Sequence, residues 1–192
     1  VIVFIIEGLT ITILYNAAFE QQRAQLVATT QSQAQLIAAM AQFDKEFSAD
    51  DVIGGATEAT MKQVRQAHSD KQGFGKTGEF LFGKKDNNKI VFLLSNRFES
   101  PSNKTKQDTP LELGGELAEP MQLALAGKSG TIIAHDYRGE WVLAAYEPVK
   151  ILNYGVVTKI DLQEIRAPFI HVGLISIAIA MTLISIGSYL FL

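Results

Sequence analysis

Residues 169–192 at the C-terminal end read FIHVGLISIAIAMTLISIGSYLFL and contain no Asp, Glu, Lys or Arg. Folded as an α-helix, this segment would be about 36 Å long, whereas the hydrocarbon core of a bilayer is about 30 Å thick. A buried helix of a soluble domain rarely continues this far without a charged residue. The segment therefore predicts a membrane-spanning helix, in which the small residues Ser176 and Ala180 would allow a second helix to approach closely.

A second apolar segment, residues 1–15, reads VIVFIIEGLTITILY and would be about 22 Å long as a helix. Because the chain does not begin with Met, we expect a first membrane span that has been clipped. A cleaved signal peptide is the alternative, but residues 15–18 (YNAA) lack the small-x-small pattern of a cleavage site. Glu7 would lie about 12 Å below the membrane surface, where a carboxyl group is costly. It either contacts Ser176 on the other span or is tolerated without a partner.

The middle of the chain, residues 16–168, contains all 17 basic residues and 19 of the 20 acidic ones, a formal net charge of −2. A weakly acidic domain without clustered Lys and Arg argues against nucleic-acid binding. The absence of Cys excludes disulfide bonds, thiolate catalysis and Cys-ligated metals. His68, His135 and His171 have no metal-ligand spacing, and no Ser, His and Asp set predicts a catalytic site. We therefore expect no enzymatic activity, no metal and no cofactor.

The hydrophobic spacing of the middle region predicts helices first and strands later. Residues 17–47 are rich in Ala and Gln, lack Gly and Pro, and repeat apolar residues at helical intervals. This long helix can be a stalk, a dimer contact or the cover of a sheet. We expect it to cover one sheet face with five apolar side chains, those of Leu26, Leu36, Ile37, Met40 and Phe43. Shorter helices are expected at residues 57–71 and 114–126.

Five strands are expected where apolar residues alternate or run together, at residues 79–84, 90–95, 131–137, 141–149 and 155–161. This order of elements favours a single α+β domain with a five-stranded antiparallel sheet packed against the long helix. The strand at residues 141–149 is apolar on both faces and should lie inside the sheet. The turn after Tyr137 leaves two registers open, because a two-residue turn places Tyr137 opposite Glu140 and a three-residue turn places it opposite Trp141.

Six polar or aromatic residues stand on or beside these apolar strands: Arg97, His135, Tyr137, Trp141, Tyr146 and Lys159. A polar side chain on a buried strand needs a partner, which a ligand can supply. An Arg at a strand end can bind a carboxylate with two hydrogen bonds, while aromatic side chains bury the rest of a small molecule. We expect a ligand pocket on the sheet face opposite the long helix, covered by residues 96–111 and 114–126. The alternative is that each is an ordinary half-exposed residue of the sheet.

Five short segments resemble the Cache sensor domain, also called PDC or PAS-like: residues 75–82 (GKTGEFLF), 127–131 (GKSGT), 136–139 (DYRG), 142–149 (VLAAYEPV) and 154–161 (YGVVTKID). The resemblance extends over residues 17–167, and its most specific parts are the TGE entry to the first strand and the closing AAYEPV and YGVVTKID sequences. The chain looks most like the single-module form of the family. The ordered Tyr, Arg, Trp and Asp signature of the double-module amino-acid receptors is absent.

This resemblance implies an extracytoplasmic sensor domain at residues 16–168, between membrane helices at residues 1–15 and 169–192 of a bacterial inner-membrane protein. Its ligand would be a small molecule, anionic if Arg97 takes a carboxylate. The family is attached to histidine kinases, chemoreceptors, diguanylate cyclases and adenylate cyclases, and a two-component sensor histidine kinase is the first expectation. A membrane-anchored extracytoplasmic enzyme and a two-span scaffold are the alternatives from other classes.

Two further expectations concern assembly and signalling. Besides membrane lipid, the expected partner is a second copy of the chain, joined through the long helix and the spans. A ligand-induced shift of the last strand should pass through residues 161–168 to the second span, because no Gly interrupts this connection.

Overall fold

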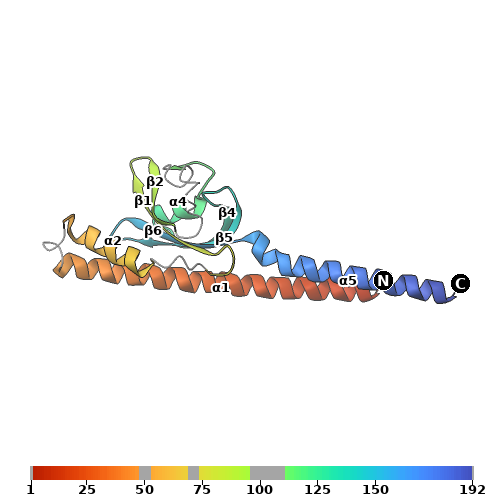
Figure 1. Cartoon of the computed structure of the whole chain (residues 1–192). Helices are drawn as coiled ribbons and strands as arrows, with labels where there is room; N and C mark the ends of the chain where they lie inside the picture. The colour runs from red at the N-terminus through yellow and green to blue at the C-terminus, as the bar shows by residue number, and fades with distance from the viewer. Residues whose placement is uncertain (1, 48–52, 69–73, 96–110, 192) are drawn as a thin grey trace. The chain divides into compact units, whose positions relative to one another are not determined.

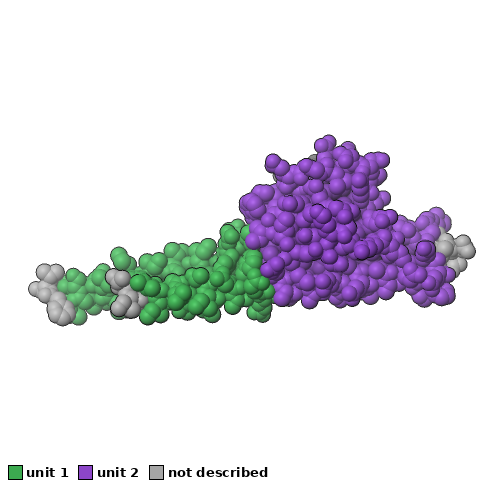
Figure 2. Space-filling view, turned by 180° about the vertical axis from the view of Figure 1, so that it is seen from behind, with its two compact units in different colours: residues 1–22, 162–192 green, residues 23–161 purple. Residues whose placement is uncertain are grey.

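The computed structural model describes residues 2–47, 53–68, 74–95 and 111–191. They form two compact units, one of residues 23–161 and one of residues 1–22 with 162–192, which Figure 2 shows in different colours. The first unit contains the sheet. The second contains the first half of helix α1 (Ile2–Phe47) and helix α5 (Leu162–Phe191).

The sheet has six antiparallel strands in the order β3-β2-β1-β6-β5-β4. The strands are β1 (Glu79–Asp86), β2 (Lys89–Ser95), β3 (Leu111–Glu112), β4 (Gly130–His135), β5 (Trp141–Val149) and β6 (Tyr154–Asp161). All five expected strands are present, and β5 lies inside the sheet between β6 and β4, as predicted. The expected number was one too low, because the two residues of β3 pair with Lys89 and Ile90 at the edge and are too few to show alternation.

Helices cover both faces of this sheet, as Figure 1 shows: α1 and α2 (Gly55–Ala67) on one face and α4 (Glu119–Leu125) on the other. We call these the α1 face and the α4 face. On the α4 face, α4 packs so closely that a Cβ added to Gly155 would come within 2.8 Å of Met121 Sδ. The expected helix at residues 114–126 is shorter than predicted, because Pro120 occupies its first turn and lacks the N–H of a helix interior.

The prediction for the side chains of α1 is right for some residues and wrong for others. Leu26 and Ile37 are buried, and Met40 packs partly against the core. Leu36 and Phe43, however, are exposed on the opposite side of the helix. Their place toward the sheet is taken by Ala34 and Ala41, both buried. Small side chains at these positions let the helix backbone lie close to the strands, so the larger apolar residues point outward.

The second unit is a pair of helical segments that contact each other. Tyr15 of α1 packs edge-on against Phe169 of α5, with ring centroids 5.5 Å apart. A Cβ on Gly173 would lie 3.8 Å from Ile11, so the two segments run antiparallel. Helix α5 contains one candidate membrane span, Leu162–Leu190, with mean hydropathy 2.3. Among the described residues it is the one such span found, so the membrane helix expected at residues 1–15 is not shown.

Candidate functional site

The structure describes five of the six predicted site residues, since Arg97 lies outside the described ranges. These five do not form one cluster. Alternation along β4, β5 and β6 places Lys159 and Tyr146 on the α4 face, where the pocket was expected, and Tyr137 packs into the core cluster on that face. His135 and Trp141 pair across β4 and β5 on the α1 face instead.

Lys159 and Tyr137 meet in a buried group of charged residues. The Lys159 ammonium lies 2.8 Å from Glu79 Oε2 and 2.7 Å from Asp136 Oδ2. Glu79 is directly opposite Lys159 in the register of β1 and β6, and all three charged side chains are at most 2% exposed. The Tyr137 hydroxyl donates to the Glu79 carboxylate over 3.1 Å, and its ring lies 5.0 Å from the Lys159 ammonium.

The same group continues through Arg138 to the end of β6. The Arg138 guanidinium donates to Asp136 over 2.7 Å through Nε and to Asp161 over 2.5 Å through a terminal nitrogen. Asp161 is the last residue of β6, and its backbone N–H donates to Thr77 Oγ1 over 3.0 Å. We call Glu79, Lys159, Asp136, Arg138 and Asp161 the charge network.

Asp136 holds the charge network at the β4–β5 turn. Its Oδ1 accepts the backbone N–H groups of Arg138 and Glu140, over 2.7 and 3.1 Å, so the carboxylate also fixes the turn. The last residues in the ladder, His135 and Trp141, face each other, and Tyr137 stands in the turn itself. Both registers predicted from the sequence are therefore wrong. The turn is longer than either, and the backbone N–H groups of Arg138 and Glu140 within it donate to the Asp136 carboxylate.

The charge network contains three carboxylates and two cations. Burial raises the pKa of Asp136, but attraction and hydrogen bonds from Lys159 and Arg138 outweigh it and hold this pKa below its ordinary value. For Asp161 burial prevails over the attraction of Arg138, and its pKa is raised. Burial lowers the pKa of Arg138, yet its two aspartate partners raise the value overall. Negative charge is therefore in excess around Lys159, and an anion there would compete with two carboxylates.

The remaining predicted residues occupy two other places. His135 Nδ1 lies 2.9 Å from the backbone oxygen of Gly139, and its ring packs on Trp141 with centroids 4.1 Å apart. The Trp141 side chain is half exposed. Tyr146 packs against the core of the α4 face, where its hydroxyl would lie 3.0 Å from a Cβ on Gly130. These positions suit surface and packing roles as well as ligand contact.

The two open hollows described next are lined by described residues, and neither includes a residue of the charge network. The larger, about 550 Å³, lies between α1 and the β5–β6 turn, with Gln31, Gln35, Gln42, Glu147 and Lys150 among its lining residues. The smaller, about 290 Å³, lies at the β1–β2 turn beside Glu112 of β3. Within the described part of the chain, no group of three or more His, Asp or Glu residues could hold a metal ion.

Sequence reasoning missed four of the five members of the charge network as site residues: Glu79, Asp136, Arg138 and Asp161. A signal was present, because each is a charged residue inside or next to an apolar strand, and the segments GEF, DYRG and KID contain all of them. Comparison of the chain with protein-family models, curated proteins and solved structures found no match. The resemblance to Cache sensor domains therefore remains an interpretation of the sequence motifs.

Proposed function

We propose that this chain is the ligand-sensing input region of a bacterial transmembrane receptor, in which a Cache-like domain outside the membrane responds to a small molecule. One observation carries the proposal. Strand β6 ends at Asp161, a member of the charge network that Arg138 links to Asp136, and the candidate membrane helix α5 begins at the next residue. A change in a buried group of the sheet domain thus has a covalent and a hydrogen-bonded route to the residue before α5.

The proposed signal starts on the α4 face. A ligand that draws Tyr137 or Lys159 toward itself weakens their bonds to Glu79 and Asp136, and Asp136 shares Arg138 with Asp161. The ligand shifts the equilibrium between two states only by its difference in affinity for them, and a hundredfold difference corresponds to about 2.7 kcal/mol. Buried ion pairs suit such a change, since removing one partner strongly penalises the charge left behind.

The excess of carboxylates in the charge network bears on the ligand. An anionic group placed beside Lys159 would also approach Glu79 and Asp136, within 3 Å of that ammonium. We therefore assign an anionic group of the ligand to Arg97, and hydrogen-bonding groups to Tyr137 and Lys159. The output is proposed to be a histidine kinase joined to α5 on the other side of the membrane, with a cyclase or chemoreceptor module as alternatives.

Ligand binding can be tested on the full chain reconstituted in lipid nanodiscs. A set of small carboxylates, amines and neutral metabolite-like compounds is screened for a rise in the unfolding temperature. A true ligand at a hundred times its Kd stabilises the folded state by about 2.7 kcal/mol. Failure of all classes to stabilise the protein contradicts the sensor proposal, and chemical conversion of a compound during incubation would favour the enzyme alternative.

Signalling is tested by joining the chain after Leu192 to the kinase region of a receptor with a known output. The ligand found in the screen should change autophosphorylation of the fusion in vesicles. The same fusion carrying Arg138→Gln is the matched variant, and it should bind the ligand while responding more weakly. An equal response in both fusions would remove the charge network from the signalling route.

A further inference from the structure

The larger hollow, between α1 and the β5–β6 turn, is lined mostly by polar side chains. We call it the glutamine hollow. Five of its nine lining residues are polar: Gln31, Gln35, Gln42, Glu147 and Lys150. A site for a small molecule encloses most of its ligand and is lined mainly by apolar side chains. The glutamine hollow is open and polar, so it suits a longer ligand that lies across the surface.

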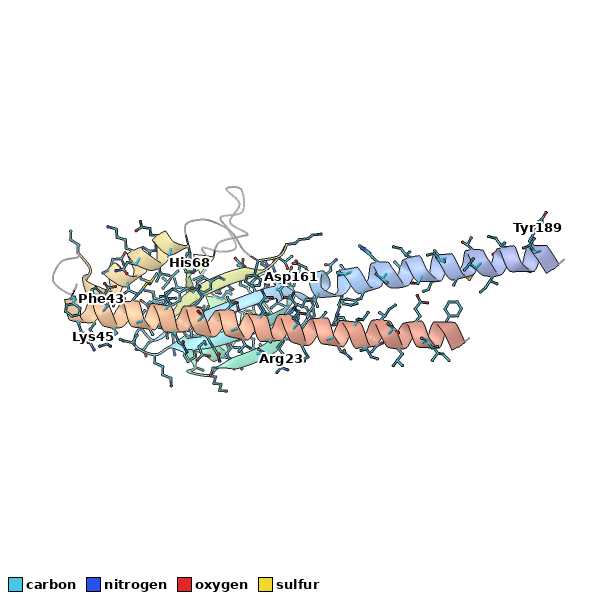
Figure 3. The ribbon with its side chains drawn as sticks, turned by 90° about the horizontal axis from the view of Figure 1, so that it is seen from below. Arg23, Phe43, Lys45, His68, Asp161 and Tyr189 are labelled. Atoms are coloured by element: carbon cyan, nitrogen blue, oxygen red, sulfur yellow. The ribbon has the colours of Figure 1, made fainter. Side chains whose placement is uncertain are left out.

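The three glutamines stand in a row along one side of α1. Gln31, Gln35 and Gln42 are four and seven residues apart, which keeps them on the same side of the helix. Figure 3 looks onto α1, and the row lies between its labelled residues Arg23 and Phe43. Eleven residues of helix extend about 16 Å, which is the length of about five residues of an extended chain.

The chemistry of the row matches that of a polypeptide backbone. A carboxamide has one acceptor oxygen and an N–H donor, as does each peptide group. Gln31 and Gln35 are about 6 Å apart along the helix, close to the spacing of about 6.7 Å between alternate residues of an extended chain. The Gln42 amide nitrogen donates to Glu46 over 2.7 Å, which leaves the Gln42 oxygen to accept. Successive glutamines can therefore bind alternate peptide groups.

Two opposite charges face the row from the sheet. Alternation along β5 directs Glu147 to the α1 face, where it is half-buried, and Lys150 is exposed at the start of the β5–β6 turn. Within the part of the chain that the structure describes, neither side chain has a hydrogen bond or an ion pair. An anion and a cation that lack partners favour a ligand carrying both charges.

Pairing of a ligand with the edge of β5 is disfavoured at this place. The last pair between β4 and β5 joins Gly130 to Tyr146, so the end of β5 extends beyond β4. Pro148, which lines the glutamine hollow, lies in this end and has no N–H to donate to an added strand. Recognition in the hollow therefore depends on side chains.

We infer that the glutamine hollow binds an extended segment of another protein, about five residues long, that carries one basic and one acidic side chain. The basic side chain pairs with Glu147, the acidic one pairs with Lys150, and the glutamines bind the peptide groups. This gives the domain a protein partner on the α1 face. The inference does not depend on a small molecule binding to the α4 face.

Disulfide trapping tests this inference, since the natural chain contains no Cys. Gln35→Cys places a thiol in the row. Ala39→Cys is the matched control, because Ala39 is exposed on the same helix but does not line the hollow. Each variant, as the full chain in nanodiscs, is equilibrated in a thiol buffer with five-residue peptides that have capped ends and a central Cys. One peptide begins with a basic residue and ends with an acidic one, the second has these ends exchanged, and the third has neutral ends.

Mass spectrometry of the protein gives the fraction that carries each peptide. On Gln35→Cys, one of the two charged peptides should be trapped about fivefold more than the other two, because only one direction brings both end charges to their partners. On Ala39→Cys, the three peptides should be trapped equally. In the Gln35→Cys chain, exchanging the charges by Glu147→Lys with Lys150→Glu should reverse which direction is preferred. Glu147→Gln with Lys150→Gln should abolish the preference.

The other outcomes would overturn the inference. These are equal trapping of all three peptides on Gln35→Cys, or a preferred direction that the charge exchange does not reverse. A single capped Cys trapped as well as the preferred peptide would indicate a site for small molecules, and disulfides between two chains in place of peptide adducts would show that a second copy covers the hollow. A peptide preference in a chain that no small compound stabilises would leave the inference intact and remove only the sensing proposal.

Discussion

The two faces of the sheet use neighbouring residues of β6 in different ways. On the α1 face, Thr158 contacts the hydroxyl of Thr30 and donates to the backbone oxygen of Leu26 over 3.1 Å. On the α4 face, the next residue, Lys159, is held by two buried carboxylates. A neutral contact thus attaches α1, and a charged one links β1, the β4–β5 turn and the end of β6. Buried charges cost more to rearrange than neutral groups, so the two faces should differ in how substitutions and pH change the stability of the domain.

The largest difference between the faces should appear on removal of the Lys159 ammonium. Lys159→Met leaves Glu79 and Asp136 buried without their shared cation, which should lower the free energy of unfolding by about 4 kcal/mol. Unfolding of the full chain in detergent is followed by fluorescence of Trp141, the single tryptophan. The control Lys150→Met removes an exposed lysine and should change little. A Lys159→Met protein as stable as the control would show that the network is not held by charge.

A smaller loss is expected at the outer end of the charge network. Arg138 is 19% exposed, so water partly replaces it, and Arg138→Gln should cost about 2 kcal/mol through lost charged hydrogen bonds. The loss is measured by urea unfolding of the full chain, with Trp141 fluorescence as the probe. A loss as large as that of Lys159→Met would mean that the network acts as one unit rather than as two separable parts centred on Lys159 and Arg138.

The charge network on the α4 face should contribute to the pH dependence of stability. The pKa of Asp136 is lowered in the folded state, so its contribution is present above the ordinary aspartate pKa of about 3.9 and is lost as the pH falls through the lowered value. The difference in stability between the natural chain and Asp136→Asn should therefore shrink as the pH falls, by at most about 1.4 kcal/mol per pH unit.

The contribution of Asp161 to stability should change with pH in the opposite direction. Its pKa is raised in the folded state, so its contribution is present below the ordinary value and is lost as the pH rises through the raised one. Asp161→Asn should therefore remove a decline in stability on the alkaline side of about pH 3.9, the ordinary aspartate pKa. If the difference in stability between each Asn variant and the natural chain is the same at every pH, the charge network does not titrate as described.

A substitution at Thr158 on the α1 face should lower the free energy of unfolding modestly, by an amount that does not depend on pH. Thr158→Val removes one hydroxyl, while Thr30 keeps its hydrogen bond of 2.7 Å to the backbone oxygen of Leu26. No buried polar group is left without a partner by this change, so a loss of about 1 kcal/mol is expected. The measurement is the unfolding free energy at two pH values. A loss that varies with pH would show that the two faces are electrically coupled through β6.

The sequence could predict those elements of the fold whose signal lies in neighbouring residues, and not those that depend on contacts between distant segments. Strands β1, β2, β4, β5 and β6 were predicted because alternation is local, whereas two-residue β3 has no pattern of its own. The outward side of α1 was misassigned, since nothing in the helical spacing favours Ala34 over Leu36 for the core. Only packing distances between helix and strands decide this choice.

The candidate site was predicted residue by residue but not as a network. Lys159 and Tyr137 were recognised as polar residues on apolar strands. Their partners Glu79 and Asp136 come from distant segments, and the pairing depends on the register of β1 with β6 and on the β4–β5 turn. The register of β1 with β6 is set by tertiary contacts, and the turn by hydrogen bonds from its own backbone to the Asp136 carboxylate. Alternation of apolar residues alone could supply neither.

The last prediction concerns the junction between β6, which carries part of the charge network, and helix α5. Inserting Gly-Gly after Asp161 leaves Thr158, Lys159 and Asp161 in place, so stability and ligand affinity should stay nearly unchanged. The insertion adds freely rotating residues between Asp161 and Leu162, and a shift of β6 should then be absorbed before α5. In the kinase fusion, the ligand response should be lost, whereas an Ala-Ala insertion, which continues the helix, is the matched control. A full response in the Gly-Gly protein would mean that the signal leaves the sheet by another element, of which α1 is the next to test.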